Sequence, residues 1–160
     1  MICVARRIIQ HWIIIIVDND SKRNSTLEYF SAVTREDERV KILYFPGEFN
    51  YSALNNFAVE HALGELIALL NNDISVKHAD WLREMVSYAV RDGVGAVGAK
   101  LYYPNGKLQH VGVAIGTGGI AGHVFCGRPA NELGYFANAV LTRQVSAVTA
   151  AYLVISKKFF

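Results

Sequence analysis

The segment Glu65–Leu70 is short and apolar, and it ends at once in the polar triplet Asn71–Asn72–Asp73. A brief apolar run bounded by polar residues is typical of a strand buried on both faces, as in the sheets of α/β proteins. In an open α/β sheet, ligands bind where the strands end. The sequence therefore predicts a strand whose end presents Asp73 to a ligand.

The same pattern of short apolar runs recurs along the first hundred residues. It predicts strands at 12–17, 40–45, 65–70 and 94–101, with helices at 26–34, 52–63 and 80–91. This alternation favours a parallel sheet with right-handed crossovers. Residues 1–11 fit either a strand or a helix, and 144–156 fit one or two strands returning to the sheet. No repeat or linker divides the chain, so one domain over 1–160 is expected.

Charge and composition narrow the classes of partner. The net charge of +2 over 160 residues implies no general attraction to nucleic acid. From residue 93 onward six bases accompany a single acid, Glu132, which suits an anionic substrate or is ordinary surface charge. No apolar run approaches the ~20 residues of a membrane span. Cys3 and Cys126 fit no metal spacing and indicate reduced thiols in a cytoplasmic protein.

Three polar loops follow consecutive predicted strands, at 18–21, 46–51 and 71–73. A nucleotide diphosphate binds with Mg²⁺ or Mn²⁺, and Mg²⁺ usually takes only one or two protein carboxylates, so Asp73 is the metal candidate. Asp18 and Asp20 could then bind the base and ribose. Aspartate and asparagine after a strand also form turns, so for 18–21 both interpretations stay open. The absence of Gly-x-Gly-x-x-Gly after the first strand counts against a dinucleotide site.

Several segments resemble, in order and spacing, the motifs of family 2 glycosyltransferases. They are Val17–Ser21, similar to the family's VDNGS strand end; Phe49–Asn56 with Gly64–Glu65, similar to its helix ending in A-x-G-E; Leu69–Asp73, similar to a variant of its Asp-x-Asp motif; and Val94–Leu101, similar to its next strand. Gln109–Gly112 and Val145–Ala151 resemble its bacterial O-antigen and rhamnosyltransferase-like branch. The resemblance runs from about residue 12 to residue 160.

The resemblance implies a GT-A fold, an α/β domain with a Rossmann-like, mostly parallel sheet sandwiched by helices. It implies a nucleotide-diphosphate sugar as donor and a saccharide or lipid-linked acceptor. Asp73 would hold Mg²⁺ or Mn²⁺, and the nucleotide would be bound by Asp18, Asn19, Asp20, Asn56 and Asn72. His110 and His123 are either contacts to the sugar or acceptor, or packing residues.

Two departures from the family pattern predict an incomplete domain. The family has a strand with a P-T-Y-N-like end, and a helix, before the segment resembling Val17–Ser21; residues 1–11 are too short for both. Without that central strand we expect a damaged sheet with an exposed edge, and hence self-association. An inverting transferase also needs a carboxylate base, and Glu132 is the only acid after Asp92.

Three hypotheses therefore remain from the sequence. The first is a glycosyltransferase domain, a fragment or degraded member lacking its base, in the cytoplasm or peripheral at the inner membrane within a longer protein. The second is a non-catalytic Rossmann-like module that binds a nucleotide or a partner. The third is another α/β enzyme such as a nucleotidyltransferase, disfavoured because no phosphate loop follows the first strand.

Overall fold

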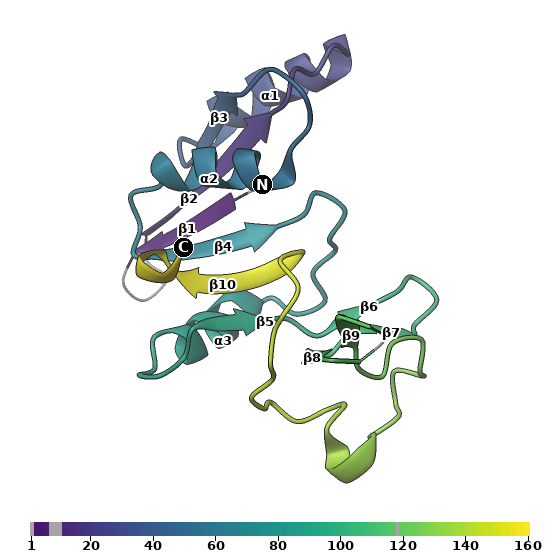
Figure 1. Cartoon of the computed structure of the whole chain (residues 1–160). Helices are drawn as coiled ribbons and strands as arrows, with labels where there is room; N and C mark the ends of the chain where they lie inside the picture. Colours follow the sequence, from purple (N-terminus) through teal and green to yellow (C-terminus); the bar gives the residue numbers. More distant parts are fainter. Residues whose placement is uncertain (1, 7–10, 118) are drawn as a thin grey trace.

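We describe residues 2–6, 11–117 and 119–160 of a computed structural model, in which a six-stranded sheet forms the centre (Figure 1). The strands stand in the order β3-β2-β1-β4-β10-β5. Their bounds are β1 Ile2–Arg6, β2 His11–Asp18, β3 Val40–Tyr44, β4 Leu66–Leu70, β5 Ala96–Gly98 and β10 Tyr152–Ser156. The strands predicted at 12–17, 40–45 and 65–70 are confirmed, whereas 94–101 divides into β5 and the short β6, Leu101–Tyr102.

The prediction of a mostly parallel sheet is wrong for its strand pairs. Only β2 and β3 pair in parallel, while β1 runs antiparallel to β2 and β4, and β10 runs antiparallel to β4 and β5. Strands β2, β3, β4 and β5 nevertheless all run in the same direction. This is because β1 lies antiparallel between β2 and β4, and β10 lies antiparallel between β4 and β5. The alternation therefore predicted the directions of these four strands correctly, and the antiparallel pairs come from β1 and β10, which are inserted between them.

Strand β1 fills the central position between β2 and β4, which corrects the expectation of a damaged sheet. Ile2 lies opposite Ile15 of β2 on one side and Leu69 of β4 on the other. Only four residues separate β1 from β2. A parallel pair needs a crossover of a dozen or more residues, so β1 can pair with β2 only in the antiparallel sense.

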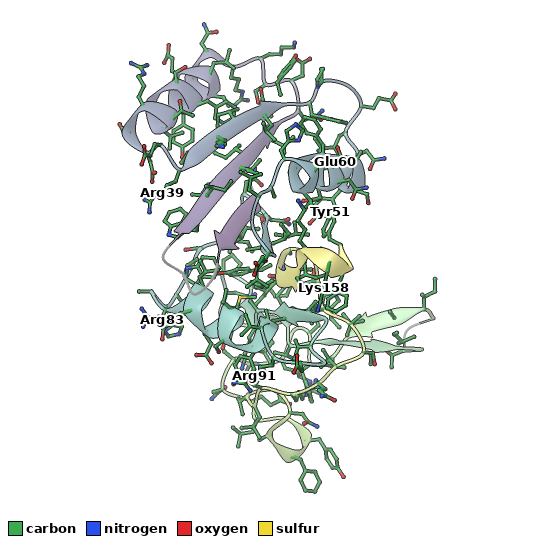
Figure 2. The ribbon with its side chains drawn as sticks, turned by 90° about the vertical axis from the view of Figure 1, so that its left-hand side faces the viewer. Arg39, Tyr51, Glu60, Arg83, Arg91 and Lys158 are labelled. Carbon is green, nitrogen blue, oxygen red and sulfur yellow. The ribbon has the colours of Figure 1, made fainter. Side chains whose placement is uncertain are left out.

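Helices cover both faces of the sheet. They are α1 Asn24–Glu36, α2 Tyr51–Glu60 and α3 Trp81–Ala89. In the edge-on view, α2 with Tyr51 and Glu60 lies on one side of the strands and α3 with Arg83 on the other (Figure 2). The alternating side chains of β4 serve both layers, since Ile67 packs with α2 and Ala68 packs with α3.

The helix α2 begins slightly earlier than the predicted segment 52–63. Asn50 is the N-cap, and its side-chain oxygen accepts the N–H of Ala53 at 3.0 Å. Asparagine is among the best N-cap residues because its side chain satisfies a free N–H of the first turn. The helix therefore begins one residue before Ser52.

The second half of the chain extends from the sheet as two small hairpins and a long irregular return (Figure 1). The elements are β7 Leu108–His110, paired with β6; β8 Val113–Ile115, paired with β9 Ala121–His123; and the short 3-10 helices Tyr135–Ala137 and Lys157–Phe159. Residues 144–151 carry no strand, so only the end of the predicted segment 144–156 returns to the sheet, as β10. Within the described residues, none of the helices has the length and apolar character to cross a bilayer.

Candidate functional site

Strands β2 and β4 end near the same edge of the sheet. Ile2 of β1 pairs with Ile15 of β2 on one side and with Leu69 of β4 on the other, so Ile15 and Leu69 lie at the same level of the sheet. From that level β2 continues to Asp18 and β4 to Leu70. Strand β1 lies between them, so two strand spacings, about 10 Å, separate β2 from β4. The polar loops after the two strands therefore leave the sheet about 10 Å apart.

Asp18, at the end of β2, is buried, with only 6% of its surface exposed. Its carboxylate Oδ1 accepts the N–H of Ser21 at 3.1 Å, so the turn interpretation of this loop is confirmed. Its backbone carbonyl accepts the N–H of Phe45 at 2.9 Å, which ties the ends of β2 and β3 together. Its second carboxylate oxygen has no hydrogen-bond partner among the described residues, so the turn does not exclude a binding role.

Asn19 holds the loop that follows β3. Its side-chain Nδ2 donates to the carbonyl oxygens of Phe45, at 2.8 Å, and Gly47, at 3.2 Å. Both donor hydrogens of the amide are thereby used within the protein. Of this side chain, only the acceptor Oδ1 is left for a nucleotide.

Asp20, in the same loop, is half-buried and has a left-handed backbone, φ 64°. Its Oδ1 accepts hydrogen bonds from Lys22 Nζ and the Tyr44 hydroxyl, both at 2.5 Å. The bond from Lys22, and then that from Tyr44, lowers the pKa of Asp20 below its ordinary 3.8. Asp20 is therefore an anion at neutral pH that is already paired with a cation, which weakens its case as a direct nucleotide ligand.

The loop after β4 is anchored at one residue and exposed beyond it. The N–H of Asn71 donates to the carbonyl of Ala151 at 3.0 Å, whereas Asn72 and Asp73 form an exposed turn. No group of three or more His, Cys, Asp or Glu side chains gathers as a metal site among the described residues. A single exposed carboxylate still fits Mg²⁺ or Mn²⁺, because Mg²⁺ usually keeps several waters and takes its other ligands from substrate phosphates.

Within the part of the chain that the structure describes, the side chain of Asn56 makes no hydrogen bond to the strand ends. It is exposed in the middle of α2. It lies five positions after Tyr51, or about 7.5 Å along the helix. Its predicted nucleotide contact therefore has less structural support than that of Asp18.

The irregular segment 145–151 is a part of the site that the sequence did not indicate. The carbonyl of Ala150 accepts the hydroxyl of Tyr51 at 3.1 Å, and the carbonyl of Ala151 accepts the N–H of Asn71. The segment thus braces the first turn of α2 and the loop after β4 at once. Its backbone carbonyls make these contacts, so the side-chain types of 145–151 gave no signal for them.

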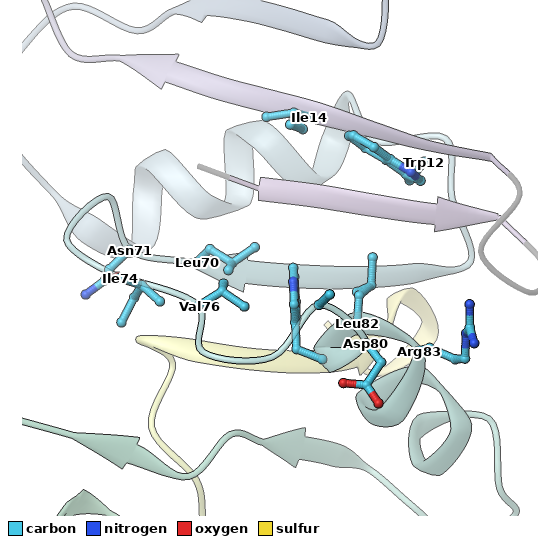
Figure 3. Close-up of a pocket in the computed structure, with 11 residues that line it drawn as sticks. Trp12, Ile14, Leu70, Asn71, Ile74, Val76, Asp80, Leu82 and Arg83 are labelled. Atoms are coloured by element: carbon cyan, nitrogen blue, oxygen red, sulfur yellow. The ribbon is translucent and has the colours of Figure 1, made fainter.

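A cavity of about 400 Å³ opens beside the same strand end (Figure 3). Its walls come from β2, the end of β4, the following loop and the start of α3, and include Trp12, Ile14, Leu70, Asn71, Val76 and Leu82. Most of these side chains are apolar, with Asn71 at one end and Asp80 and Arg83 at the other. This cavity was not predicted, because it depends on which parts of β2 and β4 the fold leaves uncovered.

His110 and His123 are brought together although 13 positions separate them. Their Nδ1 atoms are 2.9 Å apart, and His110 Nε2 lies 3.4 Å from the backbone N–H of Thr149, which donates to it. His110 is 1% exposed, and His123 is exposed on β9. Burial, and then the neighbouring His123, lower the pKa of His110 to about 4.

This shift predicts a loss of stability in acid. The unfolded chain protonates His110 near pH 6.5 and the folded protein only near pH 4, so the unfolded state holds more protons between these values. The contribution of the neutral His110 to the free energy of unfolding is fully present above pH 6.5. It falls by about 3 kcal/mol as the pH is lowered through this window. Urea unfolding across this range should show the fall, and His110→Gln should reduce it. His78→Gln, at an exposed histidine, is the matched control; an equal pH slope in both variants would contradict the assignment.

Comparison with known proteins gives two kinds of match. The family model described as Glycosyl transferase family 2 matches residues 3–157. The chain is 39% identical over 151 residues to the O-antigen biosynthesis protein RfbC of Myxococcus xanthus, which covers 94% of this chain and 12% of that protein. It is 52% identical over 147 residues to the protein of Sinorhizobium fredii named uncharacterized protein y4gI, covering 92% of this chain and 16% of that one.

The chain thus spans less than a fifth of the length of either relative. No solved structure matches it significantly.

Proposed function

This chain belongs to glycosyltransferase family 2, and we propose that its strand ends bind the nucleotide-diphosphate sugar of that family's reaction. Membership implies the GT-A fold, a nucleotide-sugar donor and a saccharide acceptor. The observation that carries the proposal is the common edge at which β2 and β4 end, with Asp18 on one side and the 71–73 loop on the other.

Asp18 is assigned to the nucleoside. Its buried Oδ1 is held by the N–H of Ser21, which fixes the orientation of the carboxylate. Its other oxygen can accept a hydrogen bond from a ribose hydroxyl or a base N–H. Asn19 and Asp20 have structural partners, so we assign them to shaping this loop around the ligand.

Asp73 is assigned to the metal. The exposed turn leaves its carboxylate free to approach a diphosphate, and Asn72 beside it supplies an amide. A bound Mg²⁺ or Mn²⁺ would supply Lewis-acid stabilisation of the leaving nucleotide diphosphate. Asn71, anchored to Ala151, would set the position of this loop relative to segment 145–151.

A binding module without sugar transfer is the alternative. Glu132, the only carboxylate after Asp92, lies 3.9 Å from Arg128 in a surface ion pair. Nothing places it beside the strand ends, so we assign no catalytic base. Sugar transfer by this chain would exclude the alternative, and donor binding without transfer would favour it.

Calorimetric titration of UDP and dTDP, with and without Mn²⁺, tests the donor site. We expect Mn²⁺-dependent binding that Asp73→Ala weakens at least about tenfold, a loss of about 1.4 kcal/mol. Asp92→Ala removes an exposed carboxylate that follows α3 and should bind as the unaltered protein does. Binding that needs no metal and survives Asp73→Ala would contradict the proposal.

A further inference from the structure

The histidine pair links three separate segments of the second half of the chain. His110 lies on β7, His123 on β9, and Thr149 in the segment that also braces the loop after β4. The two rings meet edge to face, with centroids 4.9 Å apart and planes at 75°. This arrangement brings the two imidazoles into direct hydrogen-bond contact.

The hydrogen bonds determine where each proton lies. The N–H of Thr149 donates to His110 Nε2, so this nitrogen carries a lone pair and the proton of the neutral ring is on Nδ1. His110 Nδ1 must then donate to His123 Nδ1 at 2.9 Å. His123 accepts at Nδ1, and its own proton lies on Nε2, on the far side of the ring.

Adding a proton to either ring removes one of these bonds. A second proton on His110 would place an N–H against the N–H of Thr149. A second proton on His123 would place an N–H against the Nδ1–H of His110. The chain of two bonds is therefore complete only when both imidazoles are neutral.

We propose that His110 is a positioning residue that holds His123 as a neutral hydrogen-bond donor, with its Nε2–H directed away from His110. Such a donor suits an uncharged oxygen, such as a saccharide hydroxyl, and does not form the ion pair that a phosphate would favour. The saccharide assignment rests on the proposed function, whereas the proton positions do not. His110 acts through His123 and makes no contact with a ligand itself.

Nuclear magnetic resonance on protein labelled with ¹⁵N at histidine tests the proton positions without ligand. We expect His110 as the Nδ1–H tautomer, His123 as the Nε2–H tautomer, and a scalar coupling between their Nδ1 atoms across the hydrogen bond. An Nδ1–H on His123, or the absence of coupling in the folded protein, would overturn the proposal.

Two variants separate positioning from packing. His110→Phe keeps an aromatic ring without nitrogen and should abolish the coupling. His110→Asn keeps an N–H donor near the position of Nδ1, and a coupling from the asparagine amide to His123 Nδ1 should replace the original one. If His110→Phe does not fold, the wild-type coupling and the asparagine rescue decide the question, and failure of both overturns it.

Inorganic phosphate is the probe for the ligand class. The neutral-donor proposal predicts that adding phosphate at neutral pH leaves the ring ¹⁵N shifts of His123 at their neutral values. A phosphate-induced change to the imidazolium shifts would overturn it. Because the donor site is tested by UDP binding, a failure here and a failure of the proposed function are distinguishable.

Discussion

Ile67→Ala is expected to lower the free energy of unfolding by about 4 kcal/mol, the largest stability loss we predict from one side chain. Ile67 is 0% exposed in β4, and it packs with Ile15 of β2 and with Ala58 and Val59 of α2. Removing its side chain deletes buried apolar surface and leaves a cavity between the sheet and α2 that neighbouring strands cannot close.

Urea unfolding of Ile67→Ala should show the loss as a lower midpoint with an unchanged slope. Val90→Ala is the matched control, since Val90 is 61% exposed at the end of α3 and its truncation should change stability by less than about 0.5 kcal/mol. A similar small effect at Ile67 would mean that β4 does not lie at the centre of the core.

Gly112→Ala is expected to cost about 3 kcal/mol through two separate effects. The backbone of Gly112 has φ +113°, a conformation that side chains rarely adopt. An added Cβ would also lie 2.6 Å from Val145 Cγ1, well inside van der Waals contact. The clash would displace segment 145–151, which braces the loop after β4, so we expect donor binding to weaken as well.

Two glycines separate the effects at position 112. Gly106 has φ +78° and nothing within 4 Å of an added Cβ, so Gly106→Ala carries the backbone strain alone. Gly95 has open space and no unusual φ, so Gly95→Ala should be nearly neutral or slightly stabilising. Equal unfolding free energies for Gly106→Ala and Gly112→Ala would show that the contact with Val145 is unimportant.

The central strands could be predicted because their apolar runs are local. The segments 12–17 and 65–70 are continuous apolar sequences, and polar residues mark their ends. The direction of β1 was not predicted because it follows from a four-residue connection and not from any apolar pattern. The family resemblance predicted that the central strand is missing, whereas β1 fills that position in the antiparallel direction that the short connection requires.

Of the candidate site, only the polar residues that directly follow the apolar strands could be predicted from the sequence. Asp18 and Asp73 follow apolar runs, so their place at one edge could be anticipated from the sequence. The partners of Asp20 and the pairing of His110 with His123 depend on segments that meet only in the folded chain. The bracing role of Ala150 and Ala151 uses backbone carbonyls, which no residue pattern reveals.

Paramagnetic broadening by Mn²⁺, recorded on backbone amide signals in the presence and absence of UDP, tests the donor site most directly. With UDP present, we predict that Mn²⁺ broadens the amides of residues 71–73 most strongly and that UDP itself shifts those of residues 18–21. Without UDP, the broadening at 71–73 should be much weaker, because one carboxylate holds the ion poorly. Broadening by Mn²⁺ that centres elsewhere, or UDP shifts that leave 18–21 unchanged, would contradict the assignment of this sheet edge as the donor site.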